Sequence, residues 1–599
     1  MSVMPQPWPQ PAPQIAADIA SMYQGKRERP LPVLVRDKLG GWLADEQFAG
    51  AYGVRGKPGW PPARLALVTI FQKAENLADR QAAEAVRARI DWKYALGLAG
   101  GDPGFDHSVL PEFRARVAEA GLEQVVLDTL LARLAAEGLV RAGGKQRTDS
   151  THVIAAVAAL NRLELAGESV RAALEALAAA HPAWLEQRVC VADFARRYGT
   201  PMTSWRPPAS QARRDELAIA YARDGYALLQ SVYDRSAPAW LRELPAVDVL
   251  RRVLLQNYTR TITEHGREVI RRREKEPEGD GLPPGHLRIA SPYDTDARWG
   301  VKREEFWLGY KLHITETCDD APPCTCRPAA AARQAAAGHA SESGHGRGQD
   351  RDHAKGCAHL VFPNLITTVA TTDATVTDNQ MTSAIHDDLT GKDLAPGRHY
   401  TDSGYLSAAL VVSALATSGI ALIGPLLADT SAQARAGHGY ARADFTVDYD
   451  HKTVTCPQGK TSVSWTPCAQ RGTDAIVATF SATDCGPCPA RPQCTTSSKK
   501  RRQLTVLPRG LAEAQAAARA AETTIGFRAD YARRAGVEGT MHQAASHGAR
   551  YRGLPKTRLD HASMACALNL LRLHAYWTGT PLDRQRTSHL ARLELGLAA

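Results

Sequence analysis

Three acidic residues lie in short polar motifs far apart in the chain: Asp149 in "RTDSTHV", Asp402 in "HYTDSGY" and Glu538 in "VEGTMHQ". Asp402 follows a short β-like stretch and precedes the turn-forming sequence Ser-Gly-Tyr. A carboxylate in this place either caps the turn or joins a site assembled from distant segments. Carboxylate oxygens are the ligands that hard cations such as Mg²⁺ prefer, so a site of this kind would bind a divalent metal.

Polar residues near the C-terminus fall on one face of an expected helix. Their positions are i, i+3, i+7 and i+11, occupied by Tyr531, Arg534, Glu538 and His542. At 3.6 residues per turn this spacing forms a single narrow stripe, which is polar where a core-facing stripe would be apolar. The stripe is either an ordinary exposed surface or the contribution of this helix to a site.

Five of the eleven cysteines lie close together in the last third of the chain. The candidates for a tetrahedral zinc site are Cys456, Cys485, Cys488 and Cys494. Thiolates suit Zn²⁺, and the fifth cysteine, Cys468, is the spare. The alternative is a set of buried free thiols, because the outer spacings are irregular for a zinc ribbon.

Cysteine and histidine also mingle in residues 318–358, a segment rich in Ala, Gly and Ser. Low-complexity tracts of this kind bind metals only weakly and lack the apolar residues that a packed core requires. We therefore expect a disordered loop here rather than a second metal site.

Composition points to a globular protein with a polyanionic partner. The 599 residues are 44% hydrophobic, which is enough for a sizeable buried core. Lys and Arg number 73 against 63 Asp and Glu, giving a net charge of +10 and a pI near 9.0. This excess favours polyanions, of which nucleic acid is the leading candidate.

Two segments bear on targeting. The Pro-rich start "MSVMPQPWPQPAPQ" has no apolar h-region, so we expect a flexible tail on a cytoplasmic protein rather than a signal peptide or anchor. Residues 406–428 carry no charge but are interrupted by Ser, Gly and Pro. We expect a helix, a glycine turn and a buried strand there rather than a membrane span.

The order of the expected elements predicts an α/β fold. Residues 62–140 show the apolar spacing of helices, and a strand that carries Asp149 follows. Helical signals then fill an inserted region over residues 160–285. Beyond it, strands such as "FWLGYKLHITET" and the one before Asp402 alternate with helices, which predicts a mixed sheet covered by helices.

The three acidic motifs resemble those of bacterial insertion-sequence DDE transposases. "YARRAGVEGTMHQ" matches their signature of Tyr, two residues, Arg, three residues and Glu. "DWKYALGL" and "GFDHSVLPEFRARV" resemble the helical N-terminal domain of the InsH-like type. The resemblance covers most of residues 50–575 and implies an RNase H-like fold, with Asp149 on its first strand, Asp402 after its fourth and Glu538 on a late helix.

The resemblance also implies a reaction. Asp149, Asp402 and Glu538 would hold two Mg²⁺ or Mn²⁺ ions, which serve the attacking and leaving oxygens of an in-line displacement. Water would cleave the end of the element, and the freed 3′-hydroxyl would attack target DNA without a covalent protein intermediate. The implied partners are double-stranded DNA, as terminal inverted repeats and as target, and a second copy of the chain in a synaptic homodimer near the nucleoid.

Several basic and polar residues are implied to contact DNA. Tyr531 and Arg534 would contact the backbone phosphate near the cleaved bond, since a guanidinium makes bidentate phosphate contacts. Seven residues after Glu538 the family signature has Lys or Arg, where this chain has Ala545. That phosphate contact is therefore either absent or supplied by Arg550 or Arg552.

Three functional hypotheses follow. A host nuclease with the same core is disfavoured by the N-terminal transposase-like motifs. The leading hypothesis is an active transposase, and the alternative is a catalytically inactive, zinc-containing DNA-binding protein derived from one. Both share the same expected organisation: tail and lead-in (1–45), helical N-terminal DNA-binding domain (46–144), first part of the catalytic core (145–428, with the insertion 160–285 and the loop 318–358), Cys-rich insertion (429–510), last core helices (511–580) and C-terminal tail (581–599).

Overall fold

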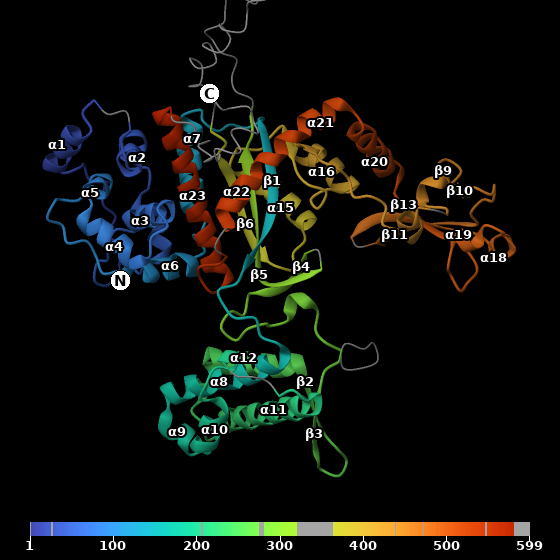
Figure 1. The fold of residues 1–599 in the computed structure, drawn as a ribbon, viewed down its shortest axis with the longest axis horizontal. Coiled ribbons are helices and arrows are strands. Elements are labelled where there is room, and N and C mark those ends of the chain that lie inside the picture. The colour runs from blue at the N-terminus through green and yellow to red at the C-terminus, as the bar shows by residue number, and fades with distance from the viewer. Residues whose placement is uncertain are drawn as a thin grey trace, which may run out of the picture.

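A computed structural model of the protein describes residues 2–25, 28–204, 208–274, 281–302, 304–319, 363–437, 439–470, 472–545 and 548–579. A central sheet stands between a group of N-terminal helices and a small β-rich unit, and a helical body lies beneath it (Figure 1). Most of the Cys- and His-rich loop expected over 318–358, and all of the expected C-terminal tail, lie outside the described residues.

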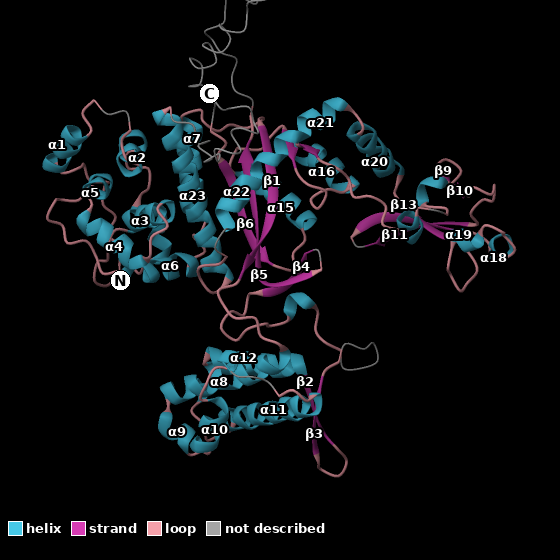
Figure 2. Ribbon diagram, viewed as in Figure 1, coloured by secondary structure: helices cyan, strands magenta, loops and turns pink. Residues whose placement is uncertain are grey.

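The central sheet has six strands and mixed pairing (Figure 2). They are β1 (Lys145–Ile154), β4 (Arg298–Lys302), β5 (Glu305–Thr317), β6 (Ile366–Asp373), β7 (Arg398–Tyr400) and β8 (Ala421–Ile423). β5 is antiparallel to β1 on one edge and to β4 and β6 on the other. β7 is parallel to both β1 and β8. The predicted mixed α/β architecture is confirmed.

Helices pack against this sheet at both faces. They are α15 (Asp378–Gly391), α16 (Ala408–Ser418), α22 (Gly536–Ala545) and α23 (Leu554–Thr578). The Ser407 hydroxyl caps α16 by accepting from the backbone N–H of Leu410, and Gly419, at φ 64°, ends it in the left-handed conformation. Residues 406–428 therefore form the predicted helix, glycine turn and strand. No helix of the described residues is long and apolar enough to cross a membrane.

The N-terminal region is helical from near its start. Its helices are α1 (Pro13–Met22), α2 (Leu31–Leu39), α3 (Pro62–Ala74), α4 (Asp79–Ala88), α5 (Ile90–Leu96), α6 (Val109–Glu119) and α7 (Val125–Ala136). The structure differs from the expected tail, because α1 and α2 lie within residues 1–45. The Pro-rich start is held by packing: Ser2 is buried, and a Cβ on Gly41 would lie 2.5 Å from Trp8.

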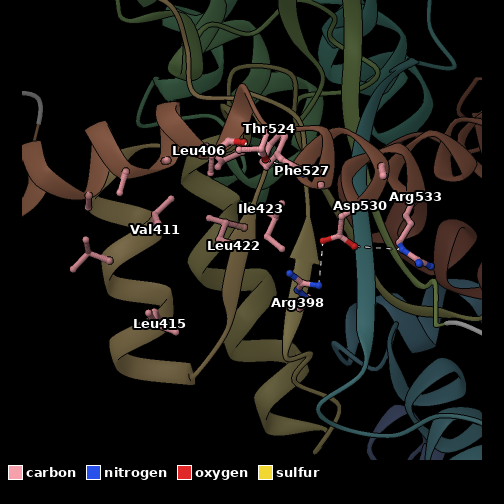
Figure 3. Close-up of a pocket in the computed structure, with 18 of the residues that line it drawn as sticks. Arg398, Leu406, Val411, Leu415, Leu422, Ile423, Thr524, Phe527, Asp530 and Arg533 are labelled. Carbon is pink, nitrogen blue, oxygen red and sulfur yellow. Dashed lines mark hydrogen bonds and ion pairs between the residues drawn. The ribbon is translucent and has the colours of Figure 1, made fainter.

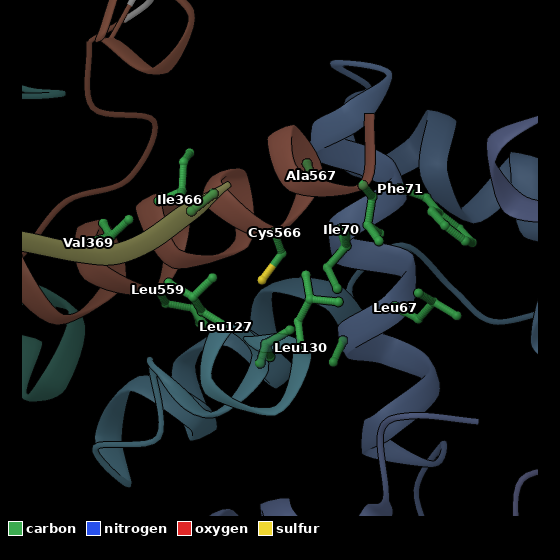
Figure 4. Packing of buried hydrophobic residues seen from close by; sticks show 14 of the residues in the cluster. Leu67, Ile70, Phe71, Leu127, Leu130, Ile366, Val369, Leu559, Cys566 and Ala567 are labelled. Carbon is green, nitrogen blue, oxygen red and sulfur yellow. The ribbon is translucent and has the colours of Figure 1, made fainter. Parts of the chain in front are cut away.

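These helices share one hydrophobic core with the sheet. Ile70 and Phe71 of α3 and Leu130 of α7 belong to one cluster, which also includes Val369 of β6 and Cys566 of α23 (Figure 4). Of the N-terminal helices, α3 packs most extensively against α23. Apolar packing is therefore continuous across residue 144, the expected domain boundary.

The insertion after β1 forms a second helical core. It contains α8 (Arg162–Ala180), α9 (Pro182–Glu186), α10 (Val191–Tyr198), α11 (Gln211–Tyr233), α12 (Pro245–Asn257) and the hairpin β2 (Tyr258–Ile262) and β3 (Glu268–Arg272). The side chain of Asn161 caps α8 by accepting from the N–H groups of Leu163 and Glu164. Val170 and Leu250 lie in a cluster separate from the core of the sheet.

The Cys-rich region is a small β-rich unit. It contains β9 (Thr446–Asp448), β10 (Thr453–Thr455), β11 (Ser464–Gln470), β12 (Thr473–Thr479), β13 (Gln503–Val506) and the short helices α18 (Ala482–Cys485) and α19 (Arg491–Cys494). Phe445, Phe480 and Leu504 form its apolar centre. The chain returns to the sheet through α20 (Arg509–Glu522), α21 (Ile525–Tyr531) and the 3-10 turn η7 (Ala532–Ala535).

Candidate active site

Parallel pairing of β1 with β7 brings two of the acidic residues together. The last paired couple is Arg147 with Tyr400, and Asp149 and Asp402 each stand two residues beyond it. Asp149 is still within β1, opposite Ile314 of β5, whereas Asp402 lies in the turn after β7. Two positions that are 253 residues apart in the sequence therefore become neighbours at one place on the sheet.

Arg534 joins the third acidic residue to this pair. Its Nη2 atom lies 2.8 Å from Oδ2 of Asp149, and its Nη1 atom lies 3.1 Å from Oε1 of Glu538. Helix α22, which carries Glu538, packs directly on β1. The three acidic motifs predicted from the sequence thus converge, with a guanidinium between two of the carboxylates.

The predicted helix that carries Tyr531, Arg534 and Glu538 is present but is not a uniform α-helix, because a 3-10 turn lies within it. Helix α21 ends at Tyr531, Arg534 lies in the turn η7, and α22 begins at Gly536. Arg534 and Glu538 remain on one side because they are still four residues apart. The ring of Tyr531 stacks on Phe527, with 5.6 Å between the ring centroids.

Burial and charge shift the ionisation of the site. Burial raises the pKa of Asp149, the negative charge of Asp402 raises it further, and Arg534 opposes both effects. Burial also raises the pKa of the Tyr531 hydroxyl, and the neighbouring carboxylates add to this. Keeping the carboxylates ionised and close together therefore has a free-energy cost from burial and mutual repulsion. A bound cation would reduce this cost.

Asp402 caps its turn, and it stays a candidate for the site. Its Oδ1 atom accepts a hydrogen bond of 2.9 Å from the backbone N–H of Gly404. A Cβ on Gly404 would lie 3.1 Å from this oxygen and 2.8 Å from Oδ2 of Asp378. The glycine therefore lets a fourth carboxylate, that of Asp378, approach the turn.

Asp378 is a site neighbour that the sequence did not reveal, because at the first position of α15 it resembles an ordinary helix start. Its Oδ1 atom accepts a 2.9 Å hydrogen bond from the hydroxyl of Ser150, the residue after Asp149. Lys311 of β5 lies 3.3 Å from the same oxygen. Next to it, Nδ1 of His313 lies 2.6 Å from the hydroxyl of Tyr405. These contacts fix the two aspartate-bearing segments to β5 and α15.

The donor set fits a hard divalent cation, because all three acidic residues offer oxygen ligands. Among the described residues, however, no group of three or more His, Cys, Asp or Glu side chains is arranged to hold a metal ion. The Arg534 guanidinium lies between Asp149 and Glu538 and supplies the positive charge there.

Two segments of the chain match transposase families. Residues 455–574 match the family model described as a transposase DDE domain, and residues 21–116 match the one described as a transposase domain, DUF772. The resemblance to insertion-sequence DDE transposases is confirmed. The first of these families consists of DNA-cutting transposases, which implies divalent metal use. Neither a curated protein nor a solved structure matches the chain.

The two transposase segments do not cover the whole site. Tyr531, Arg534 and Glu538 lie within the DDE-domain match, whereas Asp149 and Asp402 lie between the two matched segments. The segments themselves meet in the structure, because α3 of the first packs on α23 of the second. The geometry thus links the matched parts to the two unmatched aspartates.

Arg550 and Arg552, the expected substitutes for a basic residue at position 545, have protein partners. Arg550 donates a 2.7 Å hydrogen bond to the carbonyl of Leu77, which lies between α3 and α4. The guanidinium of Arg552 lies 5.5 Å from the ring centroid of Tyr293. Within the described residues, neither arginine has a hydrogen bond or ion pair with the three acidic residues, and their role in DNA binding stays a prediction.

The four candidate cysteines of the transposase-like chain gather around one small cavity in the β-rich unit. Cys456, Cys485, Cys488 and Cys494 all line it. Burial raises the pKa of the Cys494 thiol, and the three other thiols add to the effect. Cys468, the spare cysteine, lies on β11 outside this lining. The cysteines are free thiols in the structure.

An apolar groove lies beside the site, between α16, β8, α20 and α21 (Figure 3). Leu415, Leu422 and Phe527 line it, and none of the three acidic residues does. At its edge Asp530 accepts a 2.7 Å hydrogen bond from the Tyr400 hydroxyl and pairs with Arg398 at 3.2 Å. Asp530 thus fixes α21 to β7 and supports the segment that carries Arg534.

Proposed function

We propose that the protein is the transposase of an insertion sequence, which cuts the ends of the element and joins the freed 3′-hydroxyls to target DNA. The observation that carries this proposal is the convergence of Asp149, Asp402 and Glu538 around Arg534. The strand order β6, β5, β1, β7, β8 supports an RNase H-like core, with three antiparallel strands followed by two parallel ones.

The three carboxylates would hold two Mg²⁺ or Mn²⁺ ions, which activate the attacking oxygen and stabilise the leaving one when bound. Arg534 would exchange its contact with Asp149 for the phosphate of the cleaved strand, because guanidinium and phosphate match in charge and geometry. The raised pKa of Tyr531 keeps its hydroxyl protonated, so it can donate a hydrogen bond to a phosphate oxygen. Asp378, Ser150 and Lys311 would orient the aspartates without touching DNA.

The β-rich unit would bind one zinc ion through Cys456, Cys485, Cys488 and Cys494. Its support is the common cavity that these four thiols line. Closing the tetrahedron would require the thiols to move toward one another and lose their protons. Two copies of the chain would act together, because each holds one of the two DNA ends that a transposition event joins.

A strand-transfer assay tests the proposed function. The full chain is incubated with Mg²⁺ or Mn²⁺, a duplex bearing the inverted repeat that flanks the gene, and a target plasmid. Joined strands are expected. Cutting without joining would indicate a nuclease, and a shifted duplex that stays intact would indicate the inactive DNA-binding alternative, which Ala545 in place of a basic residue favours.

A further inference from the structure

A buried ion cluster lies beneath the active site. The Glu316 side chain of β5 is fully buried, and its Oε1 atom accepts from the guanidinium of Arg147 at 2.6 and 2.8 Å. Its Oε2 atom accepts from Arg572 of α23 at 2.8 Å and from the Thr540 hydroxyl of α22 at 2.7 Å. We call these four residues the Glu316 cluster. It joins β1, β5, α22 and α23 through one carboxylate.

Arg147 extends from this cluster to the segment before α22. Its Nη1 atom donates a 2.6 Å hydrogen bond to the carbonyl oxygen of Arg533. A Cβ on Gly536 would lie only 2.1 Å from the same Nη1 atom. No side chain fits at position 536 unless the guanidinium moves, so the glycine permits the close approach of β1 and α22.

Along both β1 and α22, a residue of the Glu316 cluster lies two positions from a residue of the candidate active site. Arg147 stands two residues before Asp149 in β1, so both side chains project from the same face of the sheet. The carbonyl of Arg533, which accepts from Arg147, belongs to the residue just before Arg534. Thr540 stands two residues after Glu538 in α22. The cluster therefore fixes the distance between the strand that carries one carboxylate and the helix that carries another.

We propose that the Glu316 cluster, with Gly536, positions α22 so that Glu538 and Asp149 can share bound cations. This inference rests on the proposed function. Buried ion clusters often add little stability relative to apolar packing of equal volume. The effect of this one is therefore expected in the geometry of the site rather than in the overall stability of the fold.

Two glycines of the same helix provide a matched test. Gly536→Ala forces the Arg147 guanidinium away, whereas Gly539→Ala adds a methyl group where no atom lies within 4 Å. In single-turnover cleavage Gly536→Ala is expected to be slower by about 10- to 100-fold, because small misplacements of reacting groups have costs of this order. Binding of element-end DNA is expected to change by less than about twofold. Gly539→Ala is expected to match the wild type in both.

Metal affinity provides a readout that does not depend on turnover. Mn²⁺ titration without DNA is expected to show weaker binding to Gly536→Ala than to Gly539→Ala. Gly536→Ala is also made in an Arg147→Lys background. There it is expected to weaken Mn²⁺ binding by a smaller factor, because lysine lacks the guanidinium atoms that the added methyl group would meet. Equal Mn²⁺ affinities of the two alanine variants, or an equal effect in both backgrounds, would overturn the proposal.

A second pair of variants covers the case in which Gly536→Ala does not fold. Thr540→Val removes the hydroxyl that donates to Glu316, and Thr540→Ser keeps it. Valine is expected to slow cleavage and weaken Mn²⁺ binding several-fold, and serine to restore both. Identical behaviour of the valine and serine variants would overturn the proposal.

Failure of the proposed function can be told apart from failure of this inference. If the wild type binds Mn²⁺ but joins no DNA, the proposed function fails. The Mn²⁺ affinities of the variants still decide the role of the Glu316 cluster.

Discussion

The guanidinium of Arg534 bridges the carboxylates of Asp149 and Glu538, at 2.8 and 3.1 Å. One positive charge thus contacts two carboxylates at the place where the proposed reaction requires divalent cations. A guanidinium and a metal ion cannot both lie closest to the same oxygens, so the two compete for the site.

This competition predicts a gain in metal affinity when Arg534 is removed. In Arg534→Gln the Mn²⁺ dissociation constant measured calorimetrically without DNA should fall several-fold, while strand cleavage should be lost with the phosphate contact. Arg528→Gln, which removes an exposed charge from α21, should change neither. An unaltered Mn²⁺ affinity in Arg534→Gln would show that the arginine does not oppose the metal.

Removing any one acidic residue should abolish catalysis. Asp149→Asn, Asp402→Asn and Glu538→Gln are each expected to reduce cleavage by at least about 100-fold, since each would remove a charged ligand for the proposed cations. Gel-shift assays should show nearly unchanged binding of element-end DNA. Asp387→Asn, an exposed site on α15, is the matched control. Strand transfer retained by one of the three variants would remove that residue from the site.

Four buried histidines predict a loss of stability in mild acid. Burial lowers the pKa of His313, His386 and His561 to about 4, and it lowers the pKa of His399 well below the usual value. The unfolded chain, with histidine pKa values near 6.5, takes up these protons first. The free energy of unfolding should therefore fall from about pH 6.5 toward pH 4, by up to about 1.4 kcal/mol per pH unit for each histidine.

Urea denaturation at pH values between 7.5 and 4.5 measures this slope. His386→Gln should reduce it by the contribution of one group. His265→Gln, in the exposed tip of the β2–β3 hairpin, should leave it unchanged. A pH-independent free energy of unfolding over this range would contradict the assignment.

A buried ion pair fastens the N-terminal helices to the end of the chain. Lys73 of α3 pairs with Asp560 of α23, and both side chains are about 10% exposed. Lys73→Met leaves the Asp560 charge buried and unpaired, which should lower the free energy of unfolding by about 3 to 5 kcal/mol. Adding Asp560→Leu should recover most of this loss. The exposed pair Arg87–Glu84 is the control, and its removal should cost less than about 1 kcal/mol.

The cysteine cavity predicts about one zinc ion per chain in gently purified protein. Elemental analysis should find this metal in the wild type and in Cys468→Ser, and should find it lost in Cys485→Ser and Cys494→Ser. Zinc absent from the wild type would return these cysteines to the alternative of buried free thiols.

Local signals predicted the elements well where chemistry and conformation depend on near neighbours. The glycine turn expected within residues 406–428 is Gly419, which ends α16 in the structure, because a helix cap acts within one turn. The 3-10 turn η7 was not predicted. Arg147 donates to the carbonyl of Arg533 in this turn, and it lies nearly 400 residues earlier in the chain. The Pro-rich start also misled, because its order depends on Trp8 packing against Gly41.

The site was predicted mainly by resemblance to a family. The pattern of residues alone left Asp402 as either a turn cap or a ligand, because the parallel register of β1 and β7 cannot be read from either segment. Asp378 and Glu316 were missed for the same reason. Each has an ordinary sequence context, and its partners come from strands and helices that only the folded chain brings together.

Helix α23 covers the apolar face of α3, although the two are separated by most of the chain. During synthesis the N-terminal helices therefore remain without their final cover until the ribosome has made α23. Products of termination before α23 would lack a closed interior, which leaves them to proteolysis. Only chains that include α23 would then accumulate.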